Sequence, residues 1–506
     1  MELQTYILGV DIGTGSVKAV AVGLSGEAFA STQKHYPAMQ PEPGYAEQDV
    51  GLIWQGLLDC IREVIAQTGT SPQAISLSCA MHSLILVDEA GKPLTNMINW
   101  ADIRSAEIAE KLRFSPEGKK LYKQNGTPVY SMSPLSKIIW FRENQAELFA
   151  QTAKFISIKE LIWFRLFGRF QVDHSIASAT GLFDILNFRW EENALKLAGI
   201  DANKLSEPVS TTFLRNDANT EICRKINLKP GAFWMIGAND GCLANLGSGA
   251  NQPGIAALTI GTSGAVRMAS SKPLYNFKAM TFNYLLDEKT YICGGAINNG
   301  GLVLNWLLEK FIPVKTVSAE SYQQLFDTVK TVPAGSSGLL FLPYLTGERT
   351  PLWDSNSCGV FFGIKTNHQQ AHFLRAALEG VCYAIRSVLD AILSSAEIVK
   401  EIRVSGGFTA SEVWLQIMAD VTGKKMVVVQ AEDASAIGAA YLAIQTCRFA
   451  NFSLKDSSIQ KTIMPDQEKH FLYSKYYELF GPLSQNLEKS MNQLAAINAQ
   501  QNNLYQ

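Results

Sequence analysis

Short apolar runs broken by polar turns alternate with longer stretches of helical spacing along the chain. In the first half, apolar runs at 6–10, 17–23, 28–32 and 75–79 predict strands. Between the third and fourth runs, residues 50–67 have a helical spacing whose apolar face comprises Ile53, Trp54, Leu57, Ile61 and Val64. Strands that alternate with helices are typical of layered α/β proteins.

The same alternation continues to the end of the second half. A helix closed by a glycine is expected over 159–167, and a strand is expected over 233–237. The runs within 255–268 predict a strand hairpin, and residues 371–393 predict a long apolar helix. A further strand is expected over 401–404. Both halves therefore predict the same fold class, α/β.

Two similar hairpins, one in each half, are the most distinctive feature of the sequence. Residues 10–18 read Val-Asp-Ile-Gly-Thr-Gly-Ser-Val-Lys, and residues 258–266 read Leu-Thr-Ile-Gly-Thr-Ser-Gly-Ala-Val. Turns of this composition let the backbone approach a ligand, and their N–H and hydroxyl groups can cradle phosphate oxygens. One copy would be weak evidence, because Gly-Thr-Gly also occurs in ordinary hairpins. Two copies indicate a duplicated fold that clamps a nucleotide between its halves.

The chain length predicts more than one domain. At 506 residues the chain is too long for a single core and fits two large domains. The turn-rich segment 251–254 marks the best boundary between them. We therefore expect an N-terminal domain over 1–248 and a C-terminal domain over 255–450. Residues 451–506 are expected to form a helical extension and a tail rich in Asn, Gln and Ala.

Composition and charge argue against several classes of partner. The formal net charge is -2 at pH 7, so nucleic acid and anionic membranes are not expected partners. No segment approaches the roughly 18 consecutive apolar residues of a membrane span, and the first residues lack the basic region of a signal peptide. The eight cysteines include no Cys-x-x-Cys pair, which favours free thiols in the cytoplasm over metal or disulfide use.

Two longer motifs resemble the signatures of a known family. Residues 132–144, Met-Ser-Pro-Leu-Ser-Lys-Ile-Ile-Trp-Phe-Arg-Glu-Asn, resemble the first signature of the FGGY carbohydrate kinases, and residues 359–364 with 372–380 resemble the second. The resemblance covers the chain to about residue 480. It implies two actin-like, ribonuclease-H-like ATPase domains with an interdomain active-site cleft. It also assigns the sugar site and catalytic base to the N-terminal domain and ATP binding to the C-terminal domain.

Within this family the chain most resembles the gluconate kinases. This similarity is carried by residues 80–83, 99–105, 158–160, 261–267 and 298–301. It implies that D-gluconate, a sugar acid, is phosphorylated to 6-phospho-D-gluconate by in-line transfer from ATP. Xylulokinases come next, although they more often have Met-His-Gly at 81–83 and Asn at 101. A xylulokinase or another pentulose or polyol kinase is therefore the alternative. Family members are often homodimers, but the sequence identifies no interface.

Asp240 is the candidate catalytic base. It follows a predicted strand, and Gly241 leaves room beside it for a substrate hydroxyl. The resemblance implies that its carboxylate orients this hydroxyl and accepts the proton, which leaves late in a loose transition state. The alternative is that Asp240 only caps the helix that follows, a frequent role of Asp.

The first hairpin supplies candidate metal and phosphate ligands. A carboxylate at Asp11 would repel phosphates unless a cation stood between them, so it predicts Mg²⁺ held largely through water. The alternative is an Asp that caps its own turn. Thr14, Gly15 and Ser16 are expected at the β- and γ-phosphates, although many relatives have Thr where Gly15 stands. Lys18 is expected near the γ-phosphate, or else as a solvated strand end.

The second hairpin and a later glycine pair complete the expected nucleotide site. Gly261, Thr262 and Ser263 would bind the phosphates from the other side. Gly406 and Gly407 resemble the adenosine site of the family, where a backbone without side chains lets the base or ribose lie flat.

Five residues resemble the polyol-binding positions of the family, namely Met81, His82, Trp100, Asp102 and Arg104. Asp accepts hydrogen bonds from sugar hydroxyls, Trp covers an apolar sugar face, and Arg binds oxygens in a planar fork. A lone His after a strand is more often a satisfied core residue. Because gluconate carries a carboxylate, an additional cation is expected, and Lys159 and Arg267 are the candidates. The alternative is a structural ion pair for Arg267 and a solvated helix surface for Lys159.

Two alternative hypotheses assign the same nucleotide clamp to a protein that is not a kinase. One is an actin-like or chaperone-like ATPase that works as a conformational switch, and the other is a sugar-binding regulator that has lost catalysis. The polar cluster at 100–104 together with Asp240 favours a small substrate over the first reading. Intact Asp11 and Asp240 argue against the second.

Overall fold

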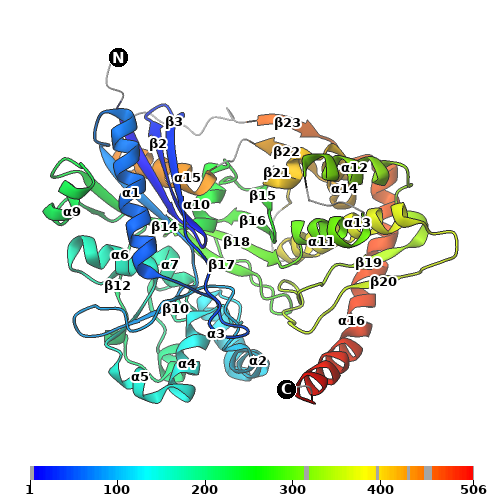
Figure 1. The fold of residues 1–506 in the computed structure, drawn as a ribbon, viewed down its shortest axis with the longest axis horizontal. Coiled ribbons are helices and arrows are strands. Elements are labelled where there is room, and N and C mark those ends of the chain that lie inside the picture. The colour runs from blue at the N-terminus through cyan, green and yellow to red at the C-terminus, as the bar shows by residue number, and fades with distance from the viewer. Residues whose placement is uncertain (1–4, 313–317, 395–397, 430–432, 450–458, 505–506) are drawn as a thin grey trace. The chain divides into compact units, whose positions relative to one another are not determined.

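A computed structural model describes residues 5–312, 318–394, 398–429, 433–449 and 459–504, and the chain folds into two compact units (Figure 1). Unit 1 comprises Met1–Asn251, Ala269–Cys293 and Asp433–Asp456. Unit 2 comprises Gln252–Met268, Gly294–Glu432 and Ser457–Gln506.

A six-stranded mixed sheet forms the centre of unit 1. Its strands, in spatial order, are β13 (Leu214–Arg215), β14 (Phe233–Asn239), β5 (Ala74–Cys79), β1 (Tyr6–Ile12), β2 (Ser16–Gly23) and β3 (Ala28–His35). β1 runs antiparallel to β2 and parallel to β5, which in turn is parallel to β14. β5 is buried along its whole length, as expected for a strand covered on both faces.

The second large sheet repeats this plan. Its seven strands, in spatial order, are β17 (Phe282–Asp287), β18 (Thr290–Ile297), β16 (Gly264–Ser270), β15 (Ile255–Ile260), β21 (Glu401–Ser405), β22 (Lys425–Val429) and β23 (Ile459–Ile463). β15 runs antiparallel to β16 and parallel to β21, which is parallel to β22. In both sheets an antiparallel hairpin lies beside two parallel strands, and the predicted α/β class and duplication are confirmed.

The helices begin and end close to the predicted residues because their caps are local. α1 (Val50–Thr68) begins after Asp49, whose carboxylate accepts hydrogen bonds from two backbone N–H groups, and ends at Gly69 in the left-handed conformation. α6 (Ile158–Phe167) has a capping box and ends at Gly168. The helix expected over 371–393 is α13 (Gln370–Leu393), and α14 (Glu412–Thr422) is a further helix of unit 2.

Smaller elements surround the sheets. In unit 1 they are β4 (Glu47–Gln48), β6 (Ile85–Val87), β7 (Met97–Ile98), α2 (Ala106–Phe114), α3 (Pro116–Asn125), α4 (Pro134–Asn144), α5 (Ala146–Gln151), β8 (Lys154–Ile156), β9 (Gln171–Asp173), α7 (His174–Ser178), β10 (Phe183–Asp184), β11 (Arg189–Trp190), α8 (Glu192–Ala198), β12 (Glu207–Val209), α9 (Thr220–Lys225) and α10 (Asp240–Gly247). In unit 2 they are α11 (Gly301–Phe311), α12 (Ala319–Lys330), β19 (Leu340–Leu342), β20 (Val360–Phe362) and α16 (Gln467–Leu504).

Helix α15 (Ala434–Cys447) belongs to unit 1, as do residues 269–293, although residues 255–450 were expected to form the C-terminal domain. It packs on α10, and Figure 1 shows the two helices side by side. The contact is close because it contains glycines: a Cβ at Gly438 would lie 2.0 Å from the Leu243 carbonyl oxygen. A Cβ at Gly9 of β1 would lie 1.8 Å from the Ala436 carbonyl oxygen.

All eight cysteines lie within the described residues, and all are free. Among the described helices, none combines the length and the apolar character needed to cross a bilayer.

Candidate active site

The turn of the first hairpin, residues 13–15 between β1 and β2, is held by side chains from β4 and from the loop after β7. Gln48 Nε2 donates to the Thr14 carbonyl oxygen at 2.8 Å, and Trp100 Nε1 donates to Thr14 Oγ1 at 3.1 Å. Gly15 is exposed, and a Cβ there would meet no atom within 4 Å. The turn therefore has a defined backbone and an accessible outer surface.

Asp11 lies at the base of this hairpin in a negatively charged environment. It is the cross-strand partner of Lys18, whose ammonium forms an ion pair with Asp433. Burial, together with the charges of Asp240 and Asp433, raises the pKa of Asp11 to about 7, although a 2.7 Å hydrogen bond from Ser78 and the charge of Lys18 act in the opposite direction. Three carboxylates near a single lysine leave negative charge that a cation would compensate.

The donor set fits a hard cation held mainly through water. Oxygen ligands suit Mg²⁺, which keeps several waters when only one or two carboxylates are available. Among the residues that the structure describes, no group of three or more His, Cys, Asp or Glu side chains could hold a metal directly. Asp11 fits the role expected from the sequence. Asp433 was not foreseen, because nothing in its local sequence connects it with Lys18.

Asp240 is the first residue of α10, but it does not cap this helix. Asn239 is the N-cap, and its side-chain oxygen accepts a 2.7 Å hydrogen bond from the Cys242 N–H. The Asp240 carboxylate accepts a 2.7 Å hydrogen bond from the N–H of its neighbour Gly241 and is half-buried. The capping role that the sequence left open for Asp240 belongs to Asn239.

Lys159 lies beneath the segment that leads to Asp240. Its side chain is 1% exposed, and its ammonium forms a 2.8 Å ion pair with Asp173. The same ammonium donates to the Ala238 carbonyl oxygen at 3.0 Å. The solvated helix surface considered from the sequence is therefore wrong. This placement fits a role in positioning the β14–α10 junction better than the expected direct contact with a substrate carboxylate.

The loop after β7 is held together by a buried ion pair. Asp102 is completely buried, and Arg104 Nε donates to it at 2.9 Å. Arg104 also forms a 2.6 Å ion pair with Glu47 and lies 3.8 Å from the centre of the Tyr45 ring. Both side chains thus have protein partners. Their arrangement favours support of the neighbouring Trp100 over the sugar contacts that the resemblance implies for them.

His82 has an unusual backbone and a hydrogen-bonded ring. Its φ is 65°, in the left-handed region that non-glycine residues rarely adopt. Ring Nδ1 lies 2.7 Å from the Ala179 carbonyl oxygen, and Nε2 lies 3.0 Å from the Tyr284 hydroxyl. Because a carbonyl only accepts, Nδ1 carries a proton, and in the neutral ring Nε2 accepts from Tyr284. Its neighbour Met81 is half-buried.

The second hairpin, β15 and β16 with the turn 261–263, is packed against the start of α11. The N–H of Gly300 donates to the Thr262 carbonyl oxygen at 3.1 Å, and the N–H of Gly301 donates to the Gly261 carbonyl oxygen at 2.7 Å. A Cβ at Gly300 would lie 2.7 Å from the Ser263 carbonyl oxygen, so a side chain is excluded there. The outer side of the turn is exposed at Gly261 and Thr262.

A cavity of about 450 Å³ adjoins this turn within unit 2. Its lining comprises Ile260, Gly261, Thr262, Gly301, Leu304, Asn305, Ala319, Tyr322, Gln323, Phe326, Gly407, Phe408, Ala410 and Trp414. The volume is in the range of small-molecule sites, and a mostly apolar lining with a few polar groups is typical of them. The Tyr322 hydroxyl donates to Asn305 Oδ1 at 2.6 Å across the α11–α12 pair. The structure thus brings Gly261, Thr262 and Gly407 to one cavity.

Gly406 and Gly407 differ in what they allow. Gly406 has a φ of 98°, and a Cβ there would lie 2.3 Å from the Ile260 carbonyl oxygen, so only glycine fits. Gly407 has open space around the corresponding position.

Arg267, the second candidate for the substrate carboxylate, lies half-buried on β16 opposite Ala257 in unit 2. The other predicted sugar-binding residues all belong to unit 1.

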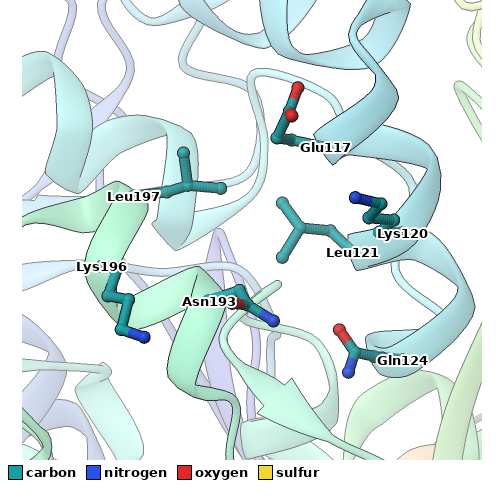
Figure 2. Close-up of a pocket in the computed structure, with 7 residues that line it drawn as sticks. All are labelled: Glu117, Lys120, Leu121, Gln124, Asn193, Lys196 and Leu197. Atoms are coloured by element: carbon teal, nitrogen blue, oxygen red, sulfur yellow. The ribbon is translucent and has the colours of Figure 1, made fainter.

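A second cavity, of about 400 Å³, lies between α3 and α8 in unit 1 (Figure 2). Its lining comprises Glu117, Lys120, Leu121, Gln124, Asn193, Lys196 and Leu197. None of these is a predicted site residue, and both lysines are exposed. We assign no ligand to this cavity.

Sequence comparison identifies the family. Residues 6–247 match the N-terminal domain of the FGGY family of carbohydrate kinases, and residues 256–447 match its C-terminal domain. The chain belongs to this family, and both the predicted family and the fold class are confirmed. The protein is accordingly an ATP-dependent carbohydrate kinase.

The relatives of this chain include gluconate kinases and a xylulose kinase. A gluconokinase of Bacillus licheniformis is 38% identical over 503 residues, which cover 97% of this chain and 98% of that protein. The crystal structure of a gluconate kinase from Lactobacillus acidophilus has a TM-score of 0.92 and 30% identity, covering 97% of this chain and 100% of that one. The ligand-bound xylulose kinase from the same species has the same TM-score, identity and coverage.

Proposed function

We propose that the protein phosphorylates D-gluconate with ATP to form 6-phospho-D-gluconate and ADP. The gluconokinase that is 38% identical over nearly the whole chain supports this substrate. The placement of Asp240 supports its role as the base. Its carboxylate lies at the end of a strand, and it is not needed to cap α10 because Asn239 does so. The xylulose kinase structure, with a TM-score of 0.92, makes a pentulose kinase the second candidate.

In this proposal Asp240 orients the acceptor hydroxyl and receives its proton. An ordinary carboxylate is a weak base, but orientation matters more than basicity where the proton leaves late. Lys159 contributes by holding the Ala238 carbonyl two residues before the base. Arg267 remains our candidate for the substrate carboxylate.

The nucleotide is proposed to bind with its base in the 450 Å³ cavity of unit 2. Phe326 and Phe408 offer apolar contact to a flat ring, and Asn305 offers polar groups. Thr262 and Ser263 of one hairpin, and Thr14 and Ser16 of the other, are the proposed phosphate ligands. Bound Mg²⁺, held through water by Asp11, would neutralise phosphate charge during transfer. The eight free thiols accord with a cytoplasmic enzyme.

The test is ADP release in the presence of Mg²⁺ and ATP with D-gluconate, D-xylulose, L-ribulose, glycerol or no sugar. Asp240→Asn is measured beside Asp201→Asn, the same change at an exposed position where no side-chain cap bond is made. We expect gluconate-dependent ADP release that falls by about 10²–10⁴ in Asp240→Asn and is unchanged in Asp201→Asn.

Stimulation by D-xylulose alone would keep the kinase and overturn the gluconate assignment. Equal rates in Asp240→Asn and wild type would remove Asp240 from the role of base.

A further inference from the structure

A second fully buried lysine lies below the proposed sugar site. Lys137 of α4 is 0% exposed. Its ammonium donates to the His82 carbonyl oxygen at 2.8 Å and to the Asn99 carbonyl oxygen at 2.7 Å. One side chain therefore joins two segments that are not neighbours in the sequence.

These two segments carry most of the predicted sugar-binding residues. His82 follows β5, next to Met81, and Asn99 follows β7, directly before Trp100. The His82 backbone has a φ of 65°, a conformation that persists only where the surroundings hold it. The bond from Lys137 to the His82 carbonyl is one such restraint.

The connection continues from Asn99 to the first hairpin. Asn99 Nδ2 donates to Gln48 Oε1 at 3.0 Å, and Gln48 Nε2 donates to the Thr14 carbonyl oxygen at 2.8 Å. Both amides are buried, at 4% and 1% exposure respectively. A chain of hydrogen bonds thus links α4 through the sugar-site loop to the phosphate-binding turn, all within unit 1.

Stability alone does not account for a lysine at this position. Burying an ammonium is costly, and an apolar side chain of similar volume often packs as well or better. Burial lowers the pKa of Lys137 to about 7. The charge of Arg104 contributes to this lowering, and the charge of Asp102 opposes it. The amine can donate to both carbonyls with or without the third proton.

We propose that Lys137 is a positioning residue that holds the two sugar-binding segments in register, and that Gln48 extends this control to the Thr14 turn. The inference rests on the proposed sugar site in unit 1. It assigns no contact between Lys137 and substrate.

The test compares Lys137→Met, which removes the donors, with Lys137→Gln, which keeps an amide donor. Lys123→Met, at an exposed position on α3, is the control. Sugar affinity is measured by calorimetry without nucleotide, and KM and kcat are measured by ADP release. We expect gluconate binding to weaken by about tenfold or more in Lys137→Met, with partial recovery in Lys137→Gln and no change in Lys123→Met.

Each other outcome is informative. Wild-type gluconate affinity in a folded Lys137→Met overturns the inference, as does an equal loss of gluconate and ATP affinity with no recovery in Lys137→Gln. If Lys137→Met does not fold, Lys137→Gln decides by the same measurement. If wild type binds D-xylulose and not gluconate, the proposed substrate fails and the same variants test Lys137 with that sugar. If wild type binds no sugar, both proposals fail.

Gln48→Met tests the extension of the network. It leaves Lys137 and its two carbonyl contacts in place but removes the donor to Thr14 and the acceptor for Asn99 Nδ2. We expect a several-fold higher KM for ATP with gluconate affinity close to wild type. An unchanged KM for ATP would limit the role of Lys137 to the sugar segments.

Discussion

At the start of α10, the neighbours Asn239 and Asp240 divide two roles that the sequence left open for Asp240 alone. Asn239 caps the helix, and the Asp240 carboxylate is not needed for that purpose. Lys159 was expected to contact the substrate or the solvent. In the fold its side chain is instead buried and paired with Asp173. Residue type and position suggested these candidates, but their partners decided between the roles.

Gly15 offers a test of the first hairpin at the residue scale. Its φ is outside the left-handed region, and a Cβ would meet no atom within 4 Å. Gly15→Thr should therefore fold normally and add a hydroxyl to the turn. We expect the KM for ATP to fall about two- to fivefold, the effect of one added hydrogen bond of about 1 kcal/mol. Gly15→Ala is the control, and equal KM values in the two variants would contradict the phosphate role of this turn.

Lys137 leads to a pH prediction. Its pKa is lowered to about 7 in the folded protein by burial, compared with about 10.4 in an unfolded chain. Between these values the unfolded state binds more protons, so the free energy of unfolding rises with pH. Wild type should gain stability relative to Lys137→Met between pH 7 and about pH 9.5, measured by urea unfolding. Parallel pH dependence in the two proteins would contradict the lowered pKa.

At the scale of elements, local signals predicted the central strands and several long helices. α1 and α6 have caps and apolar faces within their own sequence, and the two hairpins have their own turns. α15 lacks such independence. It is short of polar residues on any face. Gly438 permits its backbone contact with α10, and Gly9 permits its backbone contact with β1.

Gly438 tests the packing of α15 on α10. Gly438→Ala would place a methyl group 2.0 Å from the Leu243 carbonyl oxygen, so the helices must separate. We expect a loss of about 1–3 kcal/mol in the free energy of unfolding, as for overpacked cores. Gly481→Ala on α16 is the matched control, because no atom lies within 4 Å of its Cβ position. Thermal unfolding of both variants checks this, and an unperturbed Gly438→Ala would contradict close packing.

At the scale of the whole molecule, each unit contains one half of the expected chemistry. Unit 1 contains Asp11, Asp240 and the predicted polyol-binding residues, and unit 2 contains the cavity beside the second hairpin. The chain reaches unit 1 again near its C-terminal end, where Asp433 pairs with Lys18. This separation predicts that the affinity for ATP can be lowered without a change in the affinity for gluconate.

Gly407 tests this separation. It lines the unit 2 cavity and has open space at its Cβ position, so Gly407→Val should fold and fill part of the cavity. We expect a KM for ATP about tenfold higher, with gluconate affinity measured by calorimetry unchanged. Gly407→Ala should have an intermediate effect. Loss of gluconate affinity in Gly407→Val would contradict independent sites.

The sequence by itself determined the α/β class, the duplicated hairpins, the family and the ends of α1, α6 and α13, because each depends on residues that are close together along the chain. Asp11, Asp240 and the turn glycines could be predicted as candidate site residues for the same reason. Only the tertiary structure decided that Asp433 meets Lys18, that Lys137 joins His82 to Asn99, and that α11, α12 and the 407–410 turn enclose one cavity. These contacts join residues far apart in sequence, and packing alone brings them together.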